Sequence, residues 1–392
     1  MPIVPNAITE RYPHLQFRRH WEIGPDVHYQ LGQCNAIIRA IRETPLSPDR
    51  YKELGRVALI KGAQATTAIE GNTLTDSEVE RVADGESLPP SKQYQEREVR
   101  NVIGAMNGIV GEVAGRGETP PVSAALMLQF HRQIGADLGE HFDAVPGQFR
   151  TDERVVGPYR CPRAEDVPTL VELLCEWLQE EFPRGEDSPS FTDAVIQAIV
   201  THVYIEWIHP FGDGNGRTGR MIEFYLLLRA GNPDIASHIL SSFYNLTRPR
   251  YYRELQQGHR NRDLGAFIAY AVQGYLDGLL ETLGTILQDQ FRIAWRALIH
   301  DRFAAQRYRK KGVFKRRREL MLHFPLGEVV PIEKLAVLNL SLARKYSNLT
   351  ETTLLRDVRL LMEMDLVVHD EQAGGYRART ELLHRQMPAR RL

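Results

Sequence analysis

The residues of this chain that are best suited to chemistry lie together in one segment, HPFGDGNGRTGR, from His209 to Arg220. Four of its twelve residues are glycine, a density that is costly unless the backbone adopts unusual angles or lets another molecule approach closely. The segment runs directly into an apolar helical pattern. The amides of Gly214, Asn215 and Gly216 would therefore point off the positive end of a helix, where an anion binds well.

Charged side chains surround this expected anion site. Arg217 and Arg220 are three residues apart, so they share roughly one helix face and supply positive charge beside the anion. Asp213 is a carboxylate of the kind that holds Mg²⁺ together with phosphate oxygens, and His209 titrates near neutral pH and can accept a proton. An anion cradle, cations, a metal ligand and a base are the parts of phosphoryl-type transfer. The plainer alternative is a helix-capping turn with surface charges.

The segment resembles the signature of the Fic family, His-x-Phe-x-Asp/Glu-Gly-Asn-Gly-Arg-x-x-Arg, and matches it at every specified position. The resemblance implies a helical core in which the motif links two central helices, and a protein adenylyltransferase that uses ATP with Mg²⁺ or Mn²⁺. His209 is then the base that takes the proton from a Tyr, Ser or Thr hydroxyl of a target protein or of the enzyme itself. The hydroxyl attacks the α-phosphate in line and pyrophosphate leaves. A Fic-fold enzyme that removes AMP is the alternative within the family.

The resemblance also implies a role for each remaining residue of the site. Asp213 binds the metal, Phe211 anchors the loop in the core, and Arg217 and Arg220 hold the β- and γ-phosphates. The residues expected at the ATP site are Glu70, Gly214, Asn215, Gly216, Arg217, Thr218, Gly219, Arg220 and Tyr244.

The apolar helical pattern that begins at the signature segment is called the motif helix. Aromatic residues follow it at Tyr244, Tyr251 and Tyr252. In the Fic family a tyrosine-containing segment at this place borders the adenine, so Tyr244 is assigned to the ATP site. Core aromatics at helical spacing are the alternative.

An upstream motif, TTAIEGN from Thr66 to Asn72, is similar to the inhibitory motif of the family, Ser/Thr-x-x-x-Glu-Gly/Asn. It ends a helical pattern that stops at Gly71, a natural C-terminal stop. Glu70 therefore lies at a helix end where the macrodipole disfavours an anion, which suggests a cationic partner elsewhere. The resemblance makes that partner Arg220, and makes Thr66 and Glu70 inhibitory residues. An ordinary exposed glutamate before a glycine is the alternative.

Residues 145–159, VPGQFRTDERVVGPY, are short, extended in pattern and flanked by glycine and proline. They predict a β-hairpin inside an otherwise helical protein. Its part from Gln148 to Val156 falls where the Fic family carries a flap, which docks an extended segment of the target protein by strand addition. We therefore expect a protein target here, with a plain surface hairpin as the alternative.

The sequence changes character after residue 305. The run RYRKKGVFKRRRE at residues 307–319 is strongly basic, and two helical patterns and a hairpin around Gly374 follow it. That order fits a small winged-helix domain. We therefore expect a mainly α protein with a helical region carrying the upstream motif at 1–110, a catalytic core at 111–305, and a basic linker with a winged-helix-like domain at 306–392.

DNA binding through this C-terminal part is a second function to consider. Against it, the expected recognition helix carries Glu351, Asp357 and Glu363 beside Arg356 and Arg359, and acids that face phosphates weaken binding. A protein-interaction or dimer module is the other use of such a domain, and a homodimer stays open. A P-loop NTPase or a kinase is disfavoured, because the sequence has no G-x-x-x-x-G-K-[ST] and no H-R-D with D-F-G.

Length and composition set further bounds. A chain of 392 residues predicts two or three domains, and a net charge of -1 means that the whole molecule does not bind polyanions through charge alone. Cys34, Cys161 and Cys175 are odd in number and far apart, which argues against a disulfide framework and a zinc site. The sequence shows no signal-peptide pattern and no apolar run long enough to span a bilayer. We therefore expect a cytoplasmic protein without membrane contact.

Overall fold

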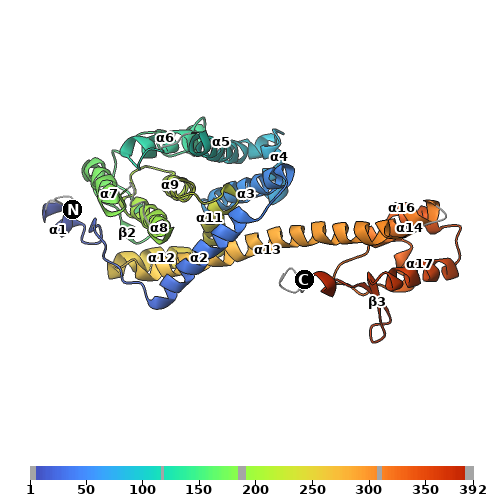
Figure 1. Cartoon of the computed structure of the whole chain (residues 1–392). Helices are drawn as coiled ribbons and strands as arrows, with labels where there is room; N and C mark the ends of the chain where they lie inside the picture. Colours follow the sequence, from blue (N-terminus) through green and yellow to red (C-terminus); the bar gives the residue numbers. More distant parts are fainter. Residues whose placement is uncertain (1–5, 116–118, 184–190, 307–310, 385–392) are drawn as a thin grey trace. The chain divides into compact units, whose positions relative to one another are not determined.

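The computed structural model describes residues 6–115, 119–183, 191–306 and 311–384 of the chain. The chain divides into two compact units, Met1–Leu283 and Gly284–Leu392, and the division falls inside one long helix, α13 (Gly265–Ala304). Helices dominate the described residues, and each unit contains one short antiparallel hairpin (Figure 1). The expected mainly α fold with a short hairpin is therefore confirmed.

The first unit contains the elements that position the site. Before α13 its described helices are α1 (Asn6–Arg11), α2 (Pro25–Glu43), α3 (Pro48–Ile69), α4 (Asp76–Ala83), α5 (Gln93–Gly115), α6 (Ala124–Gly135), α7 (Val167–Glu181), α8 (Phe191–Ile208), α9 (Asn215–Arg229), α10 (Asp234–Ser237), α11 (Ile239–Leu246) and α12 (Arg248–Asn261). The short 3₁₀ helices are η1 (Pro90–Lys92), η2 (Gly139–His141) and η3 (Ala164–Asp166), and the strands are β1 (Val155–Val156) and β2 (Tyr159–Arg160).

Helices α8 and α9 form the centre of the first unit and pack along each other. Both are buried on nearly every side, which explains why their apolar residues form no single stripe. Helices α2 and α7 pack against α8, while α3, α5 and α6 pack against α9 (Figure 1). Residues 209–214 connect α8 to α9 and are called the motif loop below. The loop is therefore held between two fully packed helices.

Helix α3 carries the upstream motif, and its two ends are well specified by the sequence. Ser47 caps the N-terminus by accepting a 3.3 Å hydrogen bond from the amide of Arg50, and a proline occupies the first turn. The helix ends at Ile69, and Gly71 follows with a φ of 103°, a conformation that favours glycine. Glu70 therefore lies at the helix end, as the sequence predicts.

The hairpin of the first unit is shorter than predicted and lies later in the chain. Strand β1 pairs with β2 around Gly157, whereas the predicted flap, Gln148 to Val156, is irregular before Val155. The guanidinium of Arg150 explains the difference, because it is buried and donates hydrogen bonds to three backbone carbonyls. These bonds fix residues 148–154 as a loop.

The second unit contains the hairpin expected near Gly374, but three helices rather than two lie between the basic run and that hairpin. After α13 its described elements are α14 (Lys311–Leu322), α15 (Ile332–Leu335), α16 (Leu340–Tyr346), α17 (Glu351–Glu363), β3 (Val367–Asp370), β4 (Gly375–Ala378) and α18 (Glu381–His384). Val330 pairs with Tyr376, so β4 has a partner on both sides. Residues 311–319 of the basic run belong to α14, so this part is a packed helix rather than the predicted linker.

The core of the second unit begins earlier than the predicted boundary at residue 306. Phe291, Trp295, Ile299 and Phe303 of α13 are buried in it, because a repeat of four residues places them on one side of the helix. The compact units accordingly divide at residue 283, while the division into 1–110, 111–305 and 306–392 stays a prediction.

Two further features concern the whole described chain. None of its helices combines the length and the apolar character needed to cross a membrane. The three cysteines, Cys34, Cys161 and Cys175, are buried and free.

Candidate active site

His209 lies where α8 gives way to the motif loop, and its backbone is held in an unusual conformation. Its φ of 52° is in the left-handed region, which residues other than glycine rarely adopt. Its amide donates to the carbonyl of Ile205 at 2.9 Å, and its own carbonyl accepts from Arg150 Nε at 2.7 Å. The amide of Arg150 also donates to the Pro210 carbonyl at 3.0 Å. These contacts fix the backbone from which the imidazole projects.

The imidazole of His209 is suited to accepting a proton. Its Nδ1 is buried and has no hydrogen-bond partner among the described residues. Burial lowers the pKa of His209 below its usual value, and the nearby carboxylate of Glu206 partly opposes that effect. The ring is therefore neutral near pH 7, which is the form that a general base needs.

The motif loop is closed by its own asparagine. Asn215 Oδ1 accepts a hydrogen bond from the amide of Phe211, and Asn215 Nδ2 donates to the carbonyl of Phe211, both at 2.9 Å. The buried ring of Phe211 stacks on His131 with 3.7 Å between the ring centroids. Phe211 therefore anchors the loop, as expected. The Asn215 side chain shapes the loop, which leaves its backbone amide for an anion.

His131 is a residue of this site that the sequence did not reveal. Its Nδ1 accepts from the amide of Gly147 at 2.9 Å, so its Nε2 carries the hydrogen and donates to the carbonyl of Asp213 at 2.9 Å. Burial lowers the pKa of His131 to about 4, so this arrangement persists at neutral pH. A single histidine within an apolar helix gave no signal that separates it from a core residue.

The first turn of α9 lies where the sequence predicts an anion site. Gly214 caps the helix with a φ of 80°, and the first amides of the helix lack partners within it. A Cβ on Gly216 would collide with Glu70 Oε1 and would lie 2.9 Å from Arg220 Nη1 and 3.0 Å from Glu206 Oε1. Three charged side chains therefore converge on one position that must be glycine.

Arg220 is enclosed by the core and held by the upstream motif. Its Nη2 donates to Glu70 Oε1 at 2.5 Å and to the Thr66 carbonyl at 3.1 Å, and its Nε donates to Thr66 Oγ1 at 2.8 Å. The side chain of Arg220 is 1% exposed and that of Glu70 is 28% exposed. Burial opposes the charge of Arg220, but Glu70, Tyr251 and Glu206 together outweigh burial and raise the pKa of Arg220. Among the described residues Nη1 has no hydrogen-bond partner, and Glu206 lies 4.0 Å from it.

Arg217 is neutralised by a different carboxylate. Its Nη1 donates to Glu98, which lies buried on α5. Asn72, the last residue of the upstream motif, donates from Nδ2 to Glu98 Oε2 at 2.8 Å. The upstream motif thus reaches both arginines, since Glu70 contacts Arg220 directly and Asn72 contacts Arg217 through Glu98.

Asp213 is the residue expected to bind the metal. Its side chain is partly exposed, and its Oδ1 accepts from the amide of Gly214 at 2.5 Å and from Arg217 Nη2 at 2.6 Å. The described residues include no group of three or more His, Cys, Asp or Glu side chains that could hold a metal ion. Mg²⁺ usually takes one or two carboxylates and completes its shell with waters and phosphate oxygens, so a single carboxylate beside an anion site fits this ion.

Two more residues of the expected ATP site lie within α9. Thr218 is buried, and its Oγ1 has no hydrogen-bond partner among the described residues. A Cβ on Gly219 would lie 3.0 Å from the His202 ring. Gly219 therefore allows α9 to pack closely against α8, which is a structural role.

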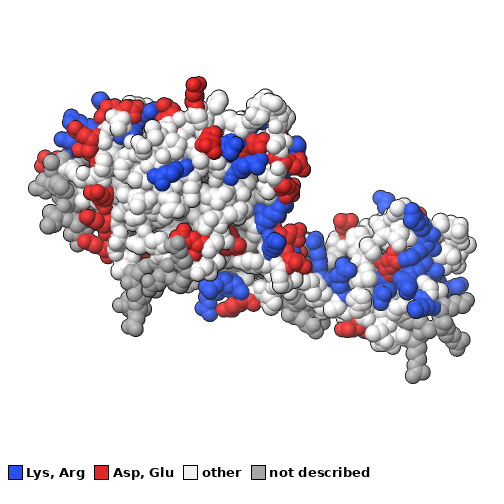
Figure 2. Space-filling view, turned by 90° about the horizontal axis from the view of Figure 1, so that it is seen from above, with Lys and Arg blue, Asp and Glu red and all other residues white. Residues whose placement is uncertain are grey.

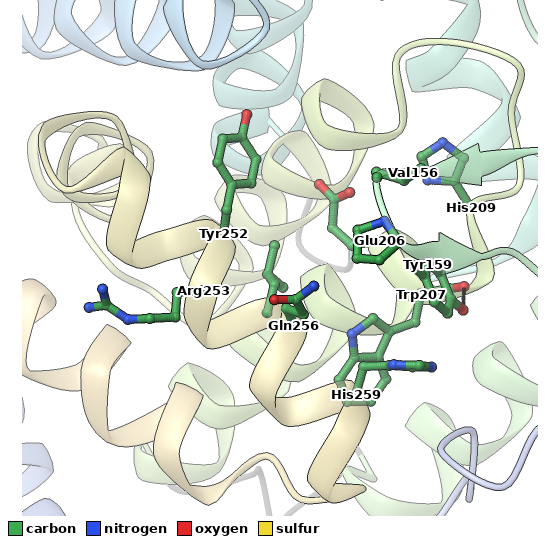
Figure 3. A pocket seen from close by; sticks show the side chains of 12 residues that line it. Val156, Tyr159, Glu206, Trp207, His209, Tyr252, Arg253, Gln256 and His259 are labelled. Atoms are coloured by element: carbon green, nitrogen blue, oxygen red, sulfur yellow. Dashed lines mark hydrogen bonds between the residues drawn. The ribbon is translucent and has the colours of Figure 1, made fainter.

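A cavity of about 450 Å³ opens beside His209 (Figure 3). Its walls come from the β1–β2 hairpin, the end of α8 and helix α12, and include Val156, Tyr159, Glu206, Trp207, Tyr252 and His259. Figure 3 shows Glu206 between Tyr252 and His209. The size and the mostly apolar walls suit a small molecule.

Tyr244 is not a wall of this cavity. It is fully buried in the core, where its hydroxyl donates to Glu223 Oε1 at 3.0 Å. Tyr251 is also buried, whereas Tyr252 is 47% exposed and lines the cavity. The structure thus corrects the position expected for Tyr244, because this residue faces inwards from α11 and Tyr252 of α12 takes the place at the cavity.

Glu206 is a second residue that sequence reasoning missed. It lies on the last turn of α8, and the ring of His202, one turn earlier, approaches its carboxylate at 3.6 Å. Burial alone would raise the pKa of Glu206, but His202 and Arg220 lower it, so the carboxylate is ionised. The available signal was an acidic residue one helical turn before the proposed base in an apolar helix.

Comparisons with known proteins match the part of the chain that contains the motif loop. A family model described as the Fic/DOC family matches residues 121–227. Protein adenylyltransferase fic-1 of Caenorhabditis briggsae is 26% identical over 233 residues, which is 57% of this chain and 43% of that protein. Protein adenylyltransferase Fic of Drosophila willistoni is 28% identical over 251 residues, which is 63% of this chain and 46% of that protein. The chain spans less than half the length of these curated relatives.

Solved structures share the fold. A Fic family protein from Desulfovibrio desulfuricans aligns with a TM-score of 0.56 at 21% identity and covers 91% of this chain and 97% of its own. A fragment of Fic-1 from C. elegans aligns with a TM-score of 0.54 at 21% identity and covers 67% of this chain and 73% of its own. At this identity the likeness concerns the fold alone, and the activity has to be argued from the site.

Proposed function

Because this chain belongs to the Fic/DOC family through residues 121–227, we propose that it is a protein adenylyltransferase restrained by Glu70. In this proposal it transfers AMP from ATP to a Tyr, Ser or Thr hydroxyl of a protein. The names of the similar curated proteins support it, as does the matched motif around His209. Removal of AMP by the same residues is the alternative within the family.

One observation carries the proposal: the anion site already holds an anion that belongs to the chain. Glu70 Oε1 lies against Gly216 in the first turn of α9 and accepts from Arg220 at 2.5 Å. A buried arginine beside the N-terminus of a helix is suited to a phosphate or a carboxylate. Because Glu70 and a phosphate group cannot occupy the same place, this contact supports a brake on the alignment of the nucleotide.

The proposed reaction forms one bond and breaks one bond at the α-phosphorus of ATP. The oxygen of the target hydroxyl attacks this phosphorus, and its proton passes to the neutral imidazole of His209. The bond from phosphorus to the bridging oxygen breaks, and pyrophosphate leaves with its electron pair. The amides of the first turn of α9 hold phosphate oxygens, and Arg220 binds the terminal phosphates once Glu70 has left it.

The proposal includes Mg²⁺ or Mn²⁺ at Asp213. Asp213 would hold this divalent ion, which would supply positive charge to the phosphates. Arg217 donates to Asp213 Oδ1 and is itself held by Glu98, so Arg217 orients the carboxylate towards the anion site. In this arrangement Arg217 acts mainly as a positioning residue, and Arg220 is the arginine that becomes free.

The β1–β2 hairpin supports a protein as the acceptor. Val155 and Val156 of β1 are exposed, and Val156 also lines the cavity beside His209. An extended segment of a target can add to such an exposed edge through backbone hydrogen bonds. This mode of docking would bring a hydroxyl near His209 with little dependence on the surrounding target sequence.

The test of the activity is label transfer to protein from ATP labelled at the α-phosphate, with Mg²⁺, in the Glu70→Gly background. We expect His209→Ala to lower this transfer by about 10²–10⁴ and to leave ATP binding by calorimetry nearly unchanged. Label at the γ-phosphate should not appear on protein. Transfer of the γ-label in place of the α-label would replace the proposal with a kinase-type reaction.

A specific observation favours a second function for the second unit. Residues 284–392 contain 21 Lys and Arg against 12 Asp and Glu, whereas residues 1–283 contain 28 against 38. The whole chain therefore has a net charge near zero, although its second unit is basic. The Lys and Arg side chains of the second unit gather at the right of Figure 2. A basic surface of this kind is typical of nucleic-acid binding.

The position of Asp357 removes part of the argument against DNA. From the sequence, its carboxylate is expected to face outwards. In the structure the carboxylate is buried and accepts from Arg316 Nε at 2.8 Å and from Arg317 Nε at 2.5 Å. Arg356 and Arg359 remain exposed on α17. The order of helices and strands supports a winged-helix domain in which α17 meets double-stranded DNA.

A gel shift with the full chain and a DNA duplex tests this second function. The double variant Arg356→Ala, Arg359→Ala should weaken binding and reduce the slope of log affinity against log salt by about 2. The matched control removes two exposed arginines of the first unit, Arg39 and Arg97. An equal loss in the control, or no salt-dependent shift with the unmodified chain, would rule out α17 as a DNA-binding helix.

A further inference from the structure

The last turn of α3, which positions Glu70, is held by side chains from another helix. The Ala68 carbonyl accepts a hydrogen bond from Arg248 Nη1 at 3.0 Å. The Ile69 carbonyl accepts one from the Tyr252 hydroxyl at 3.2 Å. The Ala68 carbonyl also accepts from the amide of Gly71 at 3.0 Å, so Arg248 adds a second, charged donor there. The Tyr252 hydroxyl supplies a donor to the Ile69 carbonyl, one of the last carbonyls of the helix, which have no partner within it.

Arg248 and Tyr252 form one unit on α12. They are four residues apart on that helix, so they share a face. The guanidinium carbon of Arg248 lies 5.8 Å from the centroid of the Tyr252 ring, within the range of a cation–π contact. Each side chain therefore supports the other while both bind the same helix end.

The end of α3 needs such support because it carries unfavourable charge. A helix C-terminus bears partial negative charge, and a cation there is stabilising while an anion is destabilising. Glu70 adds a full negative charge at the C-cap, and Gly71 follows in the left-handed conformation that ends the helix. Arg248 brings a positive charge to these carbonyls and offsets the repulsion.

We propose that Arg248 and Tyr252 are positioning residues that hold the last turn of α3 and thereby keep Glu70 on Arg220. The inference rests on the proposed function, since it concerns the regulation of the same site. Both residues act through the backbone of α3 rather than through the carboxylate of Glu70. Without them the last turn frays, Glu70 leaves Arg220 more often, and AMP transfer rises.

Three substitutions at two residues separate this role from the cavity beside His209. Tyr252 lines that cavity and Arg248 does not. Tyr252→Phe removes the hydroxyl that reaches Ile69 and keeps the ring at the cavity wall. Arg248→Ala removes the cation without altering the wall, and Arg248→Lys restores the charge and should recover part of the effect.

The experiment combines hydrogen exchange of the amides of residues 66–72 with AMP transfer by the full chain. We expect Arg248→Ala to speed exchange and to raise transfer about tenfold, which corresponds to about 1.4 kcal/mol. Tyr252→Phe should act in the same direction by about threefold, because a neutral hydrogen bond is weaker than a charged one. Arg250→Ala is the matched control, since Arg250 lies on the same helix and is paired with Glu254.

The decisive comparison repeats Arg248→Ala in the Glu70→Gly background. We expect no further rise in transfer there, because the carboxylate that Arg248 keeps in place is gone. A similar rise in both backgrounds, or unchanged exchange at residues 66–72 in Arg248→Ala, would overturn the inference. If Glu70→Gly transfers no AMP at all, the proposed activity fails, and the exchange data still decide whether Arg248 holds the helix.

Discussion

Glu98 and Arg217 form an ion pair beside the motif loop in which the two side chains are only 4% and 3% exposed. The pair joins elements that are far apart in the sequence, since Glu98 lies on α5 and Arg217 on α9. Asn72 bonds to the same carboxylate, so the upstream motif, helix α5 and the motif helix meet at one buried charge. Stability and site geometry are therefore linked at Glu98.

We predict that Glu98→Ala lowers the free energy of unfolding by about 3–5 kcal/mol, the usual effect of removing one partner of a buried pair. The value should fall near the lower end, because Asp213 still accepts from Arg217. Urea unfolding measures the change. The matched control is Glu80→Ala, whose exposed partner is Arg56 and whose effect should stay within about 1 kcal/mol. An equal, small effect of both substitutions would contradict the role of Glu98.

The second prediction concerns pH. Burial lowers the pKa of His209, so its basic form persists to lower pH than that of an ordinary histidine, and transfer should decline only below pH 6.5. Glu206 opposes that shift, as Glu70 does more weakly, while Arg150 adds to it. Glu206→Gln removes one opposing charge, so the pKa of His209 should fall further and the decline should move to lower pH.

The measurement is the pH profile of kcat/KM for Glu70→Gly with and without Glu206→Gln, which keeps the charge at residue 70 constant. A shift of the acidic decline to higher pH in the double variant would show that Glu206 does not act on His209 through its charge. No shift would show that the decline reports on another group.

The third prediction concerns the metal. Asp213→Ala should abolish the response of AMP transfer to Mg²⁺ together with most of the activity, because the phosphates lose their bridging charge. The Asp213 side chain is partly exposed, so the fold should survive, and the melting temperature serves as the control. A normal Mg²⁺ titration by this variant would mean that the ion has another ligand.

The parts of the site that the sequence predicts well are those encoded by local pattern. The glycines around the motif loop, the helix end at Glu70 and the buried anchor Phe211 each follow from a residue type and its neighbours. The side chains that lie beside these residues in the folded protein could not be predicted from local pattern. Glu98, Glu206 and His131 come from three helices, and only packing brings them to the motif loop.

The wrong expectations have the same origin. Tyr244 and Tyr252 differ in position by little more than two helical turns, and the short break between α11 and α12 decides which of them faces the cavity. Asp357 was expected at the surface, but in the structure it bonds to two arginines of α14. The strand expected before Val155 is a loop, because the guanidinium of Arg150 donates hydrogen bonds to three backbone carbonyls. For Asp357 and Arg150, hydrogen bonds made by side chains in the folded protein, rather than local propensity, settled the outcome.

The central claim is that Glu70 blocks the site by holding Arg220, and Glu70→Gly tests it most directly. Glycine is tolerated at a helix end, so the fold should survive. The measurement is label incorporation from α-labelled ATP by the unmodified chain, by Glu70→Gly, and by Glu70→Gly with Arg220→Ala. Misalignment of about 1 Å costs on the order of 10² in rate, so Glu70→Gly should raise incorporation by about that factor, and the double variant should lose it. Equal or lower incorporation by Glu70→Gly, with an unchanged melting curve, would contradict the account.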